Sequence, residues 1–426
     1  MKNTWYWLKH YRPGRLGQNT MLGAAGLGAR AVIQAAYLLI VSRWLGSEGY
    51  GLFAGSVALA TLAMPLANWG SALLLTQHIA RDRNSSRGMW ATALVQTGVV
   101  GGLLTIGILI ASSLLHERLP LGSLLILAIS ELLLLPVSHA ASSHCSALER
   151  GGAAALSVCL VPLGRTVTIL ATFATGLTAS PELAAMAHFS GTVVGIAAVI
   201  TLIAWVDGLP AWQARLPLPS ALRQGTSHAI SNIASTSYQE IDKVLMLQLL
   251  GAAAVGSYTV SFRVASIFVL PVSALISASL PRLIARAGSV DSARTYRAVL
   301  ITGIGYGVLA GIGILVAAPW IPMVFGSDYI PSTTYLYLLA PWPILYALRH
   351  CLSIYLIANQ CQIARTYADI LGLGTVTLTN LLLLPRLGAD GAAIALIGSE
   401  ALLAMAVALM IKIYPSKKYT RRNKDE

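Results

Sequence analysis

Five basic side chains stand inside long apolar stretches of the sequence. They are Arg30, Arg165, Lys243, Arg263 and Arg349. At the centre of a lipid-facing helix each would cost about 2.5–3.5 kcal/mol on an insertion scale, so we expect them to face a wet cavity or an acidic partner. The arginines lie near the middle of their stretches in both halves of the chain. This placement predicts a central cationic site, where guanidinium groups could hold an anion by forked hydrogen bonds.

Carboxylates share these apolar stretches, so the buried charges nearly balance. They are Glu131, Glu240, Asp242, Asp369 and Glu400. A permanent ion pair between Glu240 and Lys243, three residues apart on one helix, is one interpretation. The other is ion coupling, because Asp242 and Glu240, partly desolvated beside a lysine, could bind a proton or Na⁺. Glu131 and Asp369 are further candidates for that coupling role.

Residues for other common chemistries are missing from the sequence. Lys243 is the only lysine between residues 10 and 411, so no Gly-rich phosphate loop ending in lysine exists. Neither an HExxH nor a DxD pattern occurs, and the four cysteines form no CxxC pair. His139 and His144 are five residues apart, a poor match to one ligand face, and we interpret them as packed or cavity-lining. We therefore expect no catalytic residue, no metal and no cofactor, and hence no enzyme.

Composition indicates the solvent for which the chain is built. Of 426 residues, 56% are hydrophobic and 11% are charged, whereas soluble proteins carry about 25% charged residues. The net charge of +13 could suit nucleic acid, but a mean hydropathy of +0.70 is far too apolar for a nucleic-acid-binding chain. A soluble enzyme and a nucleic-acid partner are excluded, and membrane lipids are the expected surroundings.

Apolar runs long enough to span a bilayer, which takes about 20 helical residues, recur along the chain. There are twelve, at residues 19–41, 51–75, 89–115, 120–145, 153–177, 183–206, 226–249, 256–280, 298–318, 335–358, 366–385 and 391–411. The sequence therefore predicts an all-α polytopic membrane protein with about twelve transmembrane helices.

The distribution of basic residues predicts the orientation of these helices. If the N-terminus is cytoplasmic, 21 Lys and Arg residues fall in inner segments, and only Arg43, Arg118 and Arg386 fall in outer loops. Basic residues accumulate on the cytoplasmic side, and one missed span would invert the bias downstream of it. We therefore predict an even number of spans with both termini in the cytoplasm.

An internal repeat relates the two halves of the chain. A shift of 205 residues places Gly46 on Gly251, Gly51 on Gly256, Gln34 on Gln239 and Ile79-Ala80-Arg81 on Ile284-Ala285-Arg286. This predicts two six-helix lobes with the same topology, a parallel repeat typical of transporters that hold substrate between their lobes. The expected boundaries are 1–206 for the N-terminal lobe, 207–225 for a cytoplasmic interfacial linker, 226–411 for the C-terminal lobe and 412–426 for a basic cytoplasmic tail.

Four segments of the sequence resemble a known family. They are SRWLGSEGYGLFA after the first span, ALERGGAAAL after the fourth, EIDKVLMLQLLGAAAVGSYTVSFRVA across the seventh and eighth, and LGADGAAIA before the twelfth. With them the chain resembles, over nearly its whole length, the polysaccharide-export flippases of the multidrug/oligosaccharidyl-lipid/polysaccharide (MOP) superfamily. The resemblance implies two six-span bundles, a cationic central cavity and alternating access. It also implies an acid in the seventh span, where Asp242 stands.

By this resemblance, the expected function is movement of undecaprenyl-diphosphate-linked oligosaccharide from the inner to the outer leaflet of the bacterial cytoplasmic membrane, in lipopolysaccharide or O-antigen biosynthesis. A proton or sodium gradient is the expected energy source, and other polysaccharide-assembly membrane proteins are candidate partners. A multidrug or organic-cation antiporter of the same superfamily is the alternative, although it would favour a net acidic cavity. A membrane sugar polymerase or ligase fits less well, because it would need a large outer loop.

Overall fold

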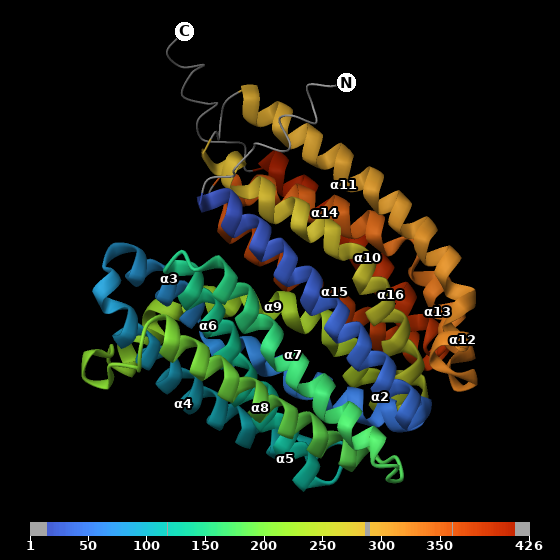
Figure 1. Ribbon diagram of the computed structural model, residues 1–426. Coiled ribbons are helices and arrows are strands. Elements are labelled where there is room, and N and C mark those ends of the chain that lie inside the picture. The colour runs from blue at the N-terminus through green and yellow to red at the C-terminus, as the bar shows by residue number, and fades with distance from the viewer. Residues whose placement is uncertain (1–14, 117, 286–289, 360, 414–426) are drawn as a thin grey trace, which may run out of the picture.

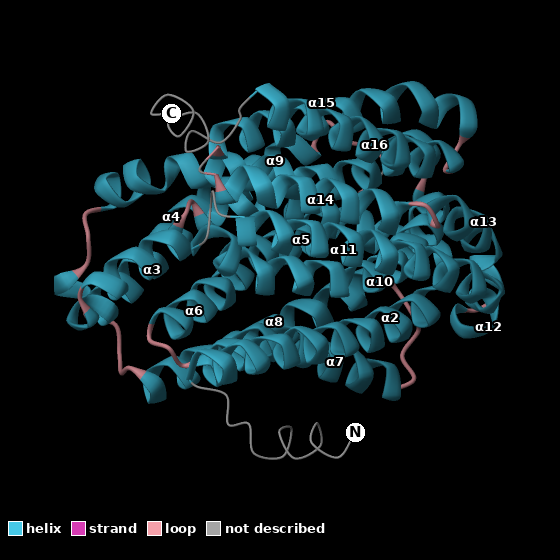
Figure 2. Ribbon diagram, turned by 90° about the horizontal axis from the view of Figure 1, so that it is seen from above, coloured by secondary structure: helices cyan, strands magenta, loops and turns pink. Residues whose placement is uncertain are grey.

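The computed structural model describes residues 15–116, 118–285, 290–359 and 361–413. Every regular element in these ranges is a helix (Figure 2), so the predicted all-α fold is confirmed. The N-terminal half contains α2 (Arg15–Asn68), α3 (Ser71–Arg81), η1 (Arg83–Ser85), α4 (Ser86–Ser112), α5 (Leu121–Ile129), η2 (Ser130–Leu134), α6 (Leu135–Ala147), α7 (Gly151–Ala174) and α8 (Pro181–Val206).

The C-terminal half repeats this pattern of long helices. It contains η3 (Trp212–Ala214), α9 (Leu218–Leu250), α10 (Ala252–Ala285), α11 (Val290–Ala317), η4 (Ala318–Trp320), α12 (Ile321–Phe325), η5 (Ser327–Tyr329), α13 (Ile330–Leu339), α14 (Trp342–Ala358), α15 (Gln362–Leu387) and α16 (Asp390–Ile413). Because α9 begins at Leu218, the segment between the halves is shorter than the expected 207–225 linker.

The helices account for the predicted number of membrane crossings. Among the described residues, nine helical segments are long and apolar enough to cross a membrane. The first of these, Met21–Arg81, contains a kink at Gly46 and so supplies two crossings. α14 is apolar but shorter, and α9 has sufficient length but a more polar sequence. With these additions the described part of this multi-pass membrane protein has twelve candidate crossings.

The loops that connect successive helices lie alternately at the two opposite ends of the bundle. At one end, where α2 begins and α16 ends (Figure 1), Arg83 pairs with Glu149 at 3.2 Å. At the other, the backbone amide of His116 donates to Gln248 Oε1 at 2.9 Å. We call these the terminal end and the Gly46 end.

Glycine permits the matching turns of the repeat at the Gly46 end. Gly46 has φ 68° and ψ 178°, and Gly251, 205 residues later, has φ 84° and ψ 175°. Residues with a Cβ atom rarely adopt such a positive φ, so a glycine is required at both positions. The repeat noted in the sequence thus corresponds to one backbone turn used twice.

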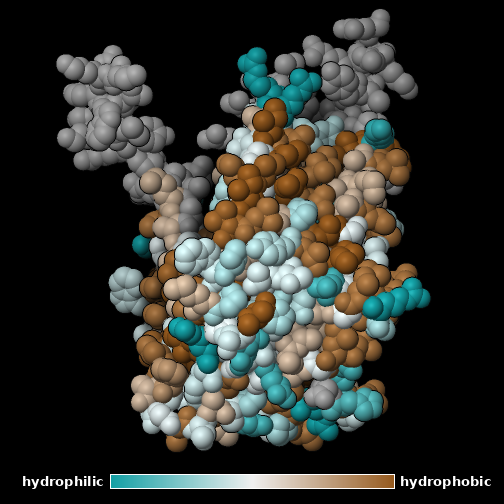
Figure 3. All heavy atoms as spheres, turned by 90° about the vertical axis from the view of Figure 1, so that its right-hand side faces the viewer, coloured by the Kyte–Doolittle hydropathy of each residue, from teal (hydrophilic) through white to brown (hydrophobic). Residues whose placement is uncertain are grey.

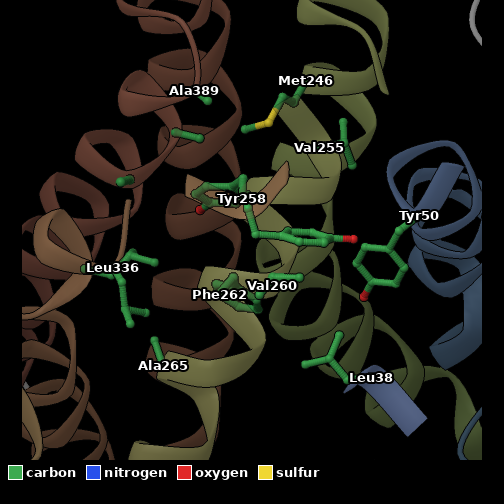
Figure 4. Close-up of a cluster of buried hydrophobic side chains, with 14 of the residues drawn as sticks. Leu38, Tyr50, Met246, Val255, Tyr258, Val260, Phe262, Ala265, Leu336 and Ala389 are labelled. Atoms are coloured by element: carbon green, nitrogen blue, oxygen red, sulfur yellow. The ribbon is translucent and has the colours of Figure 1, made fainter. Parts of the chain in front are cut away.

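The two lobes share a hydrophobic core at the Gly46 end. There Leu38 and Tyr50 of α2 lie in one buried cluster with Val255 and Tyr258 of α10, and Figure 4 shows Tyr50 facing Tyr258. Toward the terminal end, most buried clusters belong to one lobe. One contains Trp90 and Ile203 of the first lobe together with Ala221 from the beginning of α9, and others are built from C-terminal helices alone. The described structure is therefore closed between the lobes at the Gly46 end.

Hydrophobic side chains also cover the outside of the bundle. Figure 3 views the side on which α11 lies and shows apolar residues over much of that face. Along α11 the exposed side chains include Ile301, Leu309, Ile312 and Val316. A surface of this kind is solvated by acyl chains and not by water, in agreement with a membrane-spanning bundle.

Candidate functional site

A cavity of about 320 Å³ lies between the lobes. Its walls come from α2, η2, α6, α7 and α8 of the first lobe and from α9 and α10 of the second. Figure 1 shows α2, α7 and α10 running along this central region. The ionisable side chains that line it are Arg30, Tyr37, Tyr50, Glu131, His139, Arg165, His188, Glu240 and Arg263. The structure thus brings together three of the five predicted basic residues and two of the four coupling candidates.

A π-helical turn, Ser130–Leu134, carries Glu131 into the cavity wall. Pro136 follows this turn and has no amide hydrogen to donate to the carbonyl of Leu132, so the regular helix cannot continue through it. That carbonyl packs against Gly101 of α4, where an added Cβ would lie 2.2 Å from it. Proline and glycine together therefore fix a widened turn at this point, and such turns are frequent at functional sites.

Arg165 of α7 is held by two groups of the first lobe. Its Nη2 lies 2.7 Å from Glu131 Oε1, and its Nε donates to Thr192 Oγ1 at 2.8 Å. The arginine side chain is 13% exposed and that of Glu131 only 3%. Arg165 therefore reaches the cavity while remaining paired.

His188 of α8 connects the same carboxylate to α2. Its Nε2 lies 2.9 Å from Glu131 Oε1, and its Nδ1 lies 2.7 Å from the hydroxyl of Tyr37. Phe53 packs edge-on against the imidazole, with ring centroids 5.6 Å apart. Four side chains from four elements, Tyr37, His188, Glu131 and Arg165, thus form one continuous polar chain.

The second lobe presents a different arrangement around Glu240 of α9. Arg263 Nη2 lies 3.2 Å from Glu240 Oε1, and Lys243 Nζ lies 3.4 Å from Glu240 Oε2. Lys243 also pairs with Asp242 at 3.0 Å, donates to the carbonyl of Gln239 and stacks over Phe262. The predicted pair of Glu240 with Lys243 is present. Arg263 is the accessible member, since 45% of its side chain is exposed.

Arg30 of α2 differs from the other two cavity arginines. Among the described residues its side chain has no carboxylate within ion-pair distance and no hydrogen-bond partner, although it lines the cavity. Of the two surroundings expected for these arginines, a wet cavity or an acidic partner, Arg30 has only the cavity, whereas Arg165 and Arg263 have both. Three guanidinium groups face two carboxylates in the lining, so the cavity carries an excess positive charge even after pairing.

Arg349 and Asp369, predicted as site residues, lie elsewhere in the second lobe. Arg349 Nε is 2.6 Å from Glu400 Oε2, and Asp369 lies 3.7 Å from Arg365. Both line a separate small cavity of about 50 Å³. Arg349, Lys243 and Asp242 are absent from the lining of the central cavity. Their charges are matched within the lobe, so only Arg30, Arg165 and Arg263 continue as substrate-binding candidates.

Sequence reasoning passed over His188, Tyr37 and Thr192. Each lies in an apolar stretch, and the side chains that it contacts come from a different element. The only feature of the sequence that could have indicated this site is His188, a single histidine in an apolar run. His139 lines the cavity, whereas His144 pairs with Asp207 at 2.9 Å near the terminal end.

Comparison with known proteins identifies the family. The family described as "Polysaccharide biosynthesis protein" matches residues 16–287, which cover the whole N-terminal lobe and the cavity-lining helices of the second. The chain belongs to the polysaccharide biosynthesis protein family. A search of curated proteins finds no match.

Solved structures of MOP superfamily transporters share the fold. An inward-facing multidrug resistance MATE family transporter aligns with a TM-score of 0.71 at 16% identity, covering 92% of this chain and 97% of that one. The lipid II flippase MurJ in an inward closed conformation aligns with a TM-score of 0.74 at 11% identity, covering 94% and 89%. A MOP superfamily transporter from Pyrococcus furiosus, whose title reports a binding pocket of reverse polarity, aligns at 0.62 and 17% identity, covering 92% and 94%. The MOP fold with two six-helix lobes is therefore established for this family member.

Proposed function

We propose that this chain is a flippase that moves a diphosphate-linked oligosaccharide lipid across the bacterial cytoplasmic membrane. The observation that carries the proposal is the central cavity, where the unpaired Arg30 stands with Arg165 and Arg263 between the lobes. Membership of the polysaccharide biosynthesis family supports it, and so does the fold shared with a lipid II flippase. Undecaprenyl diphosphate carrying an O-antigen or another lipopolysaccharide precursor is the proposed cargo.

The charge of the cargo explains the cavity. A diphosphate diester bears about two negative charges, and moving it through the low-dielectric core requires compensating positive charge near mid-membrane. Guanidinium groups offer fixed pairs of N–H donors that match phosphate oxygens. Arg30 and Arg165 belong to the first lobe and Arg263 to the second, so one diphosphate between them would contact both lobes as they rock.

The proposed function also includes an energy source, a membrane orientation and partner proteins. A proton or sodium gradient is the proposed energy source, with Glu131 as the candidate for proton coupling and with Glu240 and Asp242 as candidates for holding Na⁺. Both termini are proposed to be cytoplasmic, and other membrane proteins of polysaccharide assembly are proposed partners. An organic-cation antiporter, the alternative, would require a cavity with excess negative charge. The lining residues have the opposite balance.

Complementation tests the function. A bacterial strain lacking its own flippase for a lipid-linked glycan is supplied with the wild-type chain or with Arg30→Ala, Arg165→Ala and Arg263→Ala, singly and combined. We expect export with the wild type, reduced export with single variants and none with the triple variant. Arg386→Ala, at an exposed position near the Gly46 end, is the matched control and retains export. Membrane levels are measured for each variant.

Direct binding then separates the two candidate functions. Purified protein in detergent is titrated with a short-chain prenyl-diphosphate sugar, the corresponding uncharged prenol, and a lipophilic organic cation. Binding of the diphosphate alone supports the flippase. Preferential binding of the cation, or full export by the triple arginine variant at normal membrane levels, would overturn the proposal.

A further inference from the structure

We propose that Glu131 and His188 form a proton-binding site that is coupled to anion binding through Arg165. This inference rests on the proposed function and deepens it, because it names a second ligand of the same cavity. The ligand is one proton, held in the first lobe. Glu131 and Arg165 lie in the wall of the cavity, and His188 connects them to Tyr37 of α2.

Two of the three guanidinium nitrogens of Arg165 contact groups of the first lobe. Its Nη2 is 2.7 Å from Glu131, and its Nε is committed to Thr192. Thr192 in turn accepts from Ser130, the residue before Glu131, and donates to the carbonyl of His188. A diphosphate that draws the guanidinium into the cavity therefore competes with Glu131 for the same N–H groups.

The hydrogen bonds around His188 leave room for one added proton. With His188 neutral and Glu131 ionised, Nε2–H donates to Glu131 and Nδ1 accepts from the hydroxyl of Tyr37, so every contact is satisfied. If a proton is added, both imidazole nitrogens donate and the Tyr37 oxygen accepts. The ring does not have to move, because Tyr37 can act as donor or acceptor. The pair can therefore gain a proton while keeping both contacts.

The titratable and charged groups that face this pair lie on α2, α6, α7, α9 and α10. They are Arg30, Tyr37 and Tyr50 of α2, His139 of α6, Arg165 of α7, and Glu240 and Arg263 across the cavity. The sequence of α5 has no ionisable residue, and the only one in α4, Arg87, contacts Leu209 in the segment between the lobes. Arg165 is the cation in contact with Glu131, so its position determines whether the carboxylate is compensated.

The direction of the coupling follows from this contact. When the Arg165 guanidinium moves from Glu131 to a bound diphosphate, the Glu131 carboxylate is no longer compensated by a cation. The Glu131–His188 pair then binds a proton more readily. By linkage, the anion must then bind more tightly as the pH falls. Proton uptake and anion binding are therefore positively coupled.

Glu240 provides an internal comparison. It has two cationic partners, Arg263 and Lys243, and Lys243 is fully buried behind it. If the diphosphate draws Arg263 away, Lys243 still compensates the carboxylate. We therefore expect no proton uptake at Glu240.

Calorimetry of the whole protein in detergent tests the inference. The probe is a short-chain prenyl-diphosphate sugar, whose phosphates are both diesters and do not titrate near neutral pH. Titrations in two buffers with different ionisation enthalpies give the number of protons exchanged. The wild type is expected to take up close to one proton per bound ligand, and its Kd to fall by up to about tenfold per unit decrease in pH.

The variants locate the proton. In Glu131→Gln the uptake should disappear while the probe still binds, because Arg165 is released from its carboxylate. Glu240→Gln should retain the uptake. In His188→Gln, which keeps hydrogen bonds to the same neighbours, the uptake and the pH dependence should both be diminished. Thermal unfolding confirms that each variant is folded.

Two failures can be distinguished. If the wild type does not bind the probe, the proposed function fails. If the wild type binds it with no proton uptake between pH 6 and 8, or if Glu131→Gln retains the wild-type uptake, the coupling site is refuted while the flippase proposal stands.

Discussion

Gly51 of α2 and Gly256 of α10 pack backbone against backbone across the two lobes. A Cβ atom added to Gly51 would lie 1.7 Å from the carbonyl oxygen of Ala252, and one added to Gly256 would lie 1.9 Å from that of Ser47. Ser47 and Ala252 are also 205 residues apart. The two contacts are therefore one contact repeated around a pseudo-two-fold axis, and the absence of side chains on both glycines allows the Gly46 end to close.

Gly51→Ala should loosen this closure. The added methyl group cannot fit beside the Ala252 carbonyl, so the lobes must separate at the Gly46 end. In a background without the four native cysteines, Ser266→Cys in the cavity should then react several-fold faster with an impermeant thiol reagent applied from that side. Gly98→Ala is the control, because its added Cβ has no neighbour within 4 Å. Equal labelling in both variants would contradict the prediction.

The orientation of the bundle can be measured in the same cysteine-free background. The excess of basic residues in inner segments predicts that the terminal end is cytoplasmic. Thr178→Cys, in the exposed turn between α7 and α8, should be labelled by an impermeant reagent in intact cells. Asn84→Cys, in the exposed turn between α3 and α4, should be labelled only after permeabilisation. The reverse pattern would invert the assignment.

Arg30 should discriminate guanidinium from ammonium. Hydrogen bonds to charged groups contribute about 1.5–3 kcal/mol each, so Arg30→Ala should weaken binding of the prenyl-diphosphate probe by roughly 10- to 100-fold. Arg30→Lys should recover only part of this loss, because lysine lacks the planar fork. Calorimetric Kd values provide the measurement. Full recovery with lysine would show that charge alone matters at this position.

Arg349 and Glu400 should behave as a structural pair. The Glu400 side chain is buried and that of Arg349 is 12% exposed, and Glu400 also accepts from Trp342 Nε1 at 3.3 Å. Removing one partner of a buried pair costs about 3–5 kcal/mol, since the other charge is left uncompensated. Arg349→Ala should therefore lower the Tm markedly, and the double variant with Glu400→Gln should recover part of the loss. If the double variant is no more stable than Arg349→Ala, the pair has no structural role.

Local patterns in the sequence predicted local features well. The pair of Glu240 with Lys243 follows from a spacing of three residues on one helix, and the matching turns at Gly46 and Gly251 follow from the repeat. The pairing of Arg165 could not be predicted in this way. Its partner Glu131 lies on a different helix, and which carboxylate meets which arginine is decided by tertiary packing.

The same limit applies to Arg349 and Arg30. Both are single arginines in apolar helices, and nothing in their neighbours along the chain separates them. The fold buries Arg349 against Glu400 of α16 and leaves Arg30 facing the cavity. The Glu131–His188 pair required knowledge of how α8 lies against the π-helical turn, and a single sequence does not provide that.

Because the two lobes share a hydrophobic cluster, the surrounding lipid affects the free-energy cost of opening the Gly46 end. Separating α2 from α10 would uncover side chains such as Tyr50 and Val255. In water this exposure would cost about 25 cal/mol for each Å² of apolar surface. Lipid tails are as apolar as leucine and solvate the same surface at little cost. Acyl chains that enter between the separating lobes would therefore lower the free-energy cost of opening. The rate at which the lobes open and close should then depend on the fluidity of the surrounding lipid.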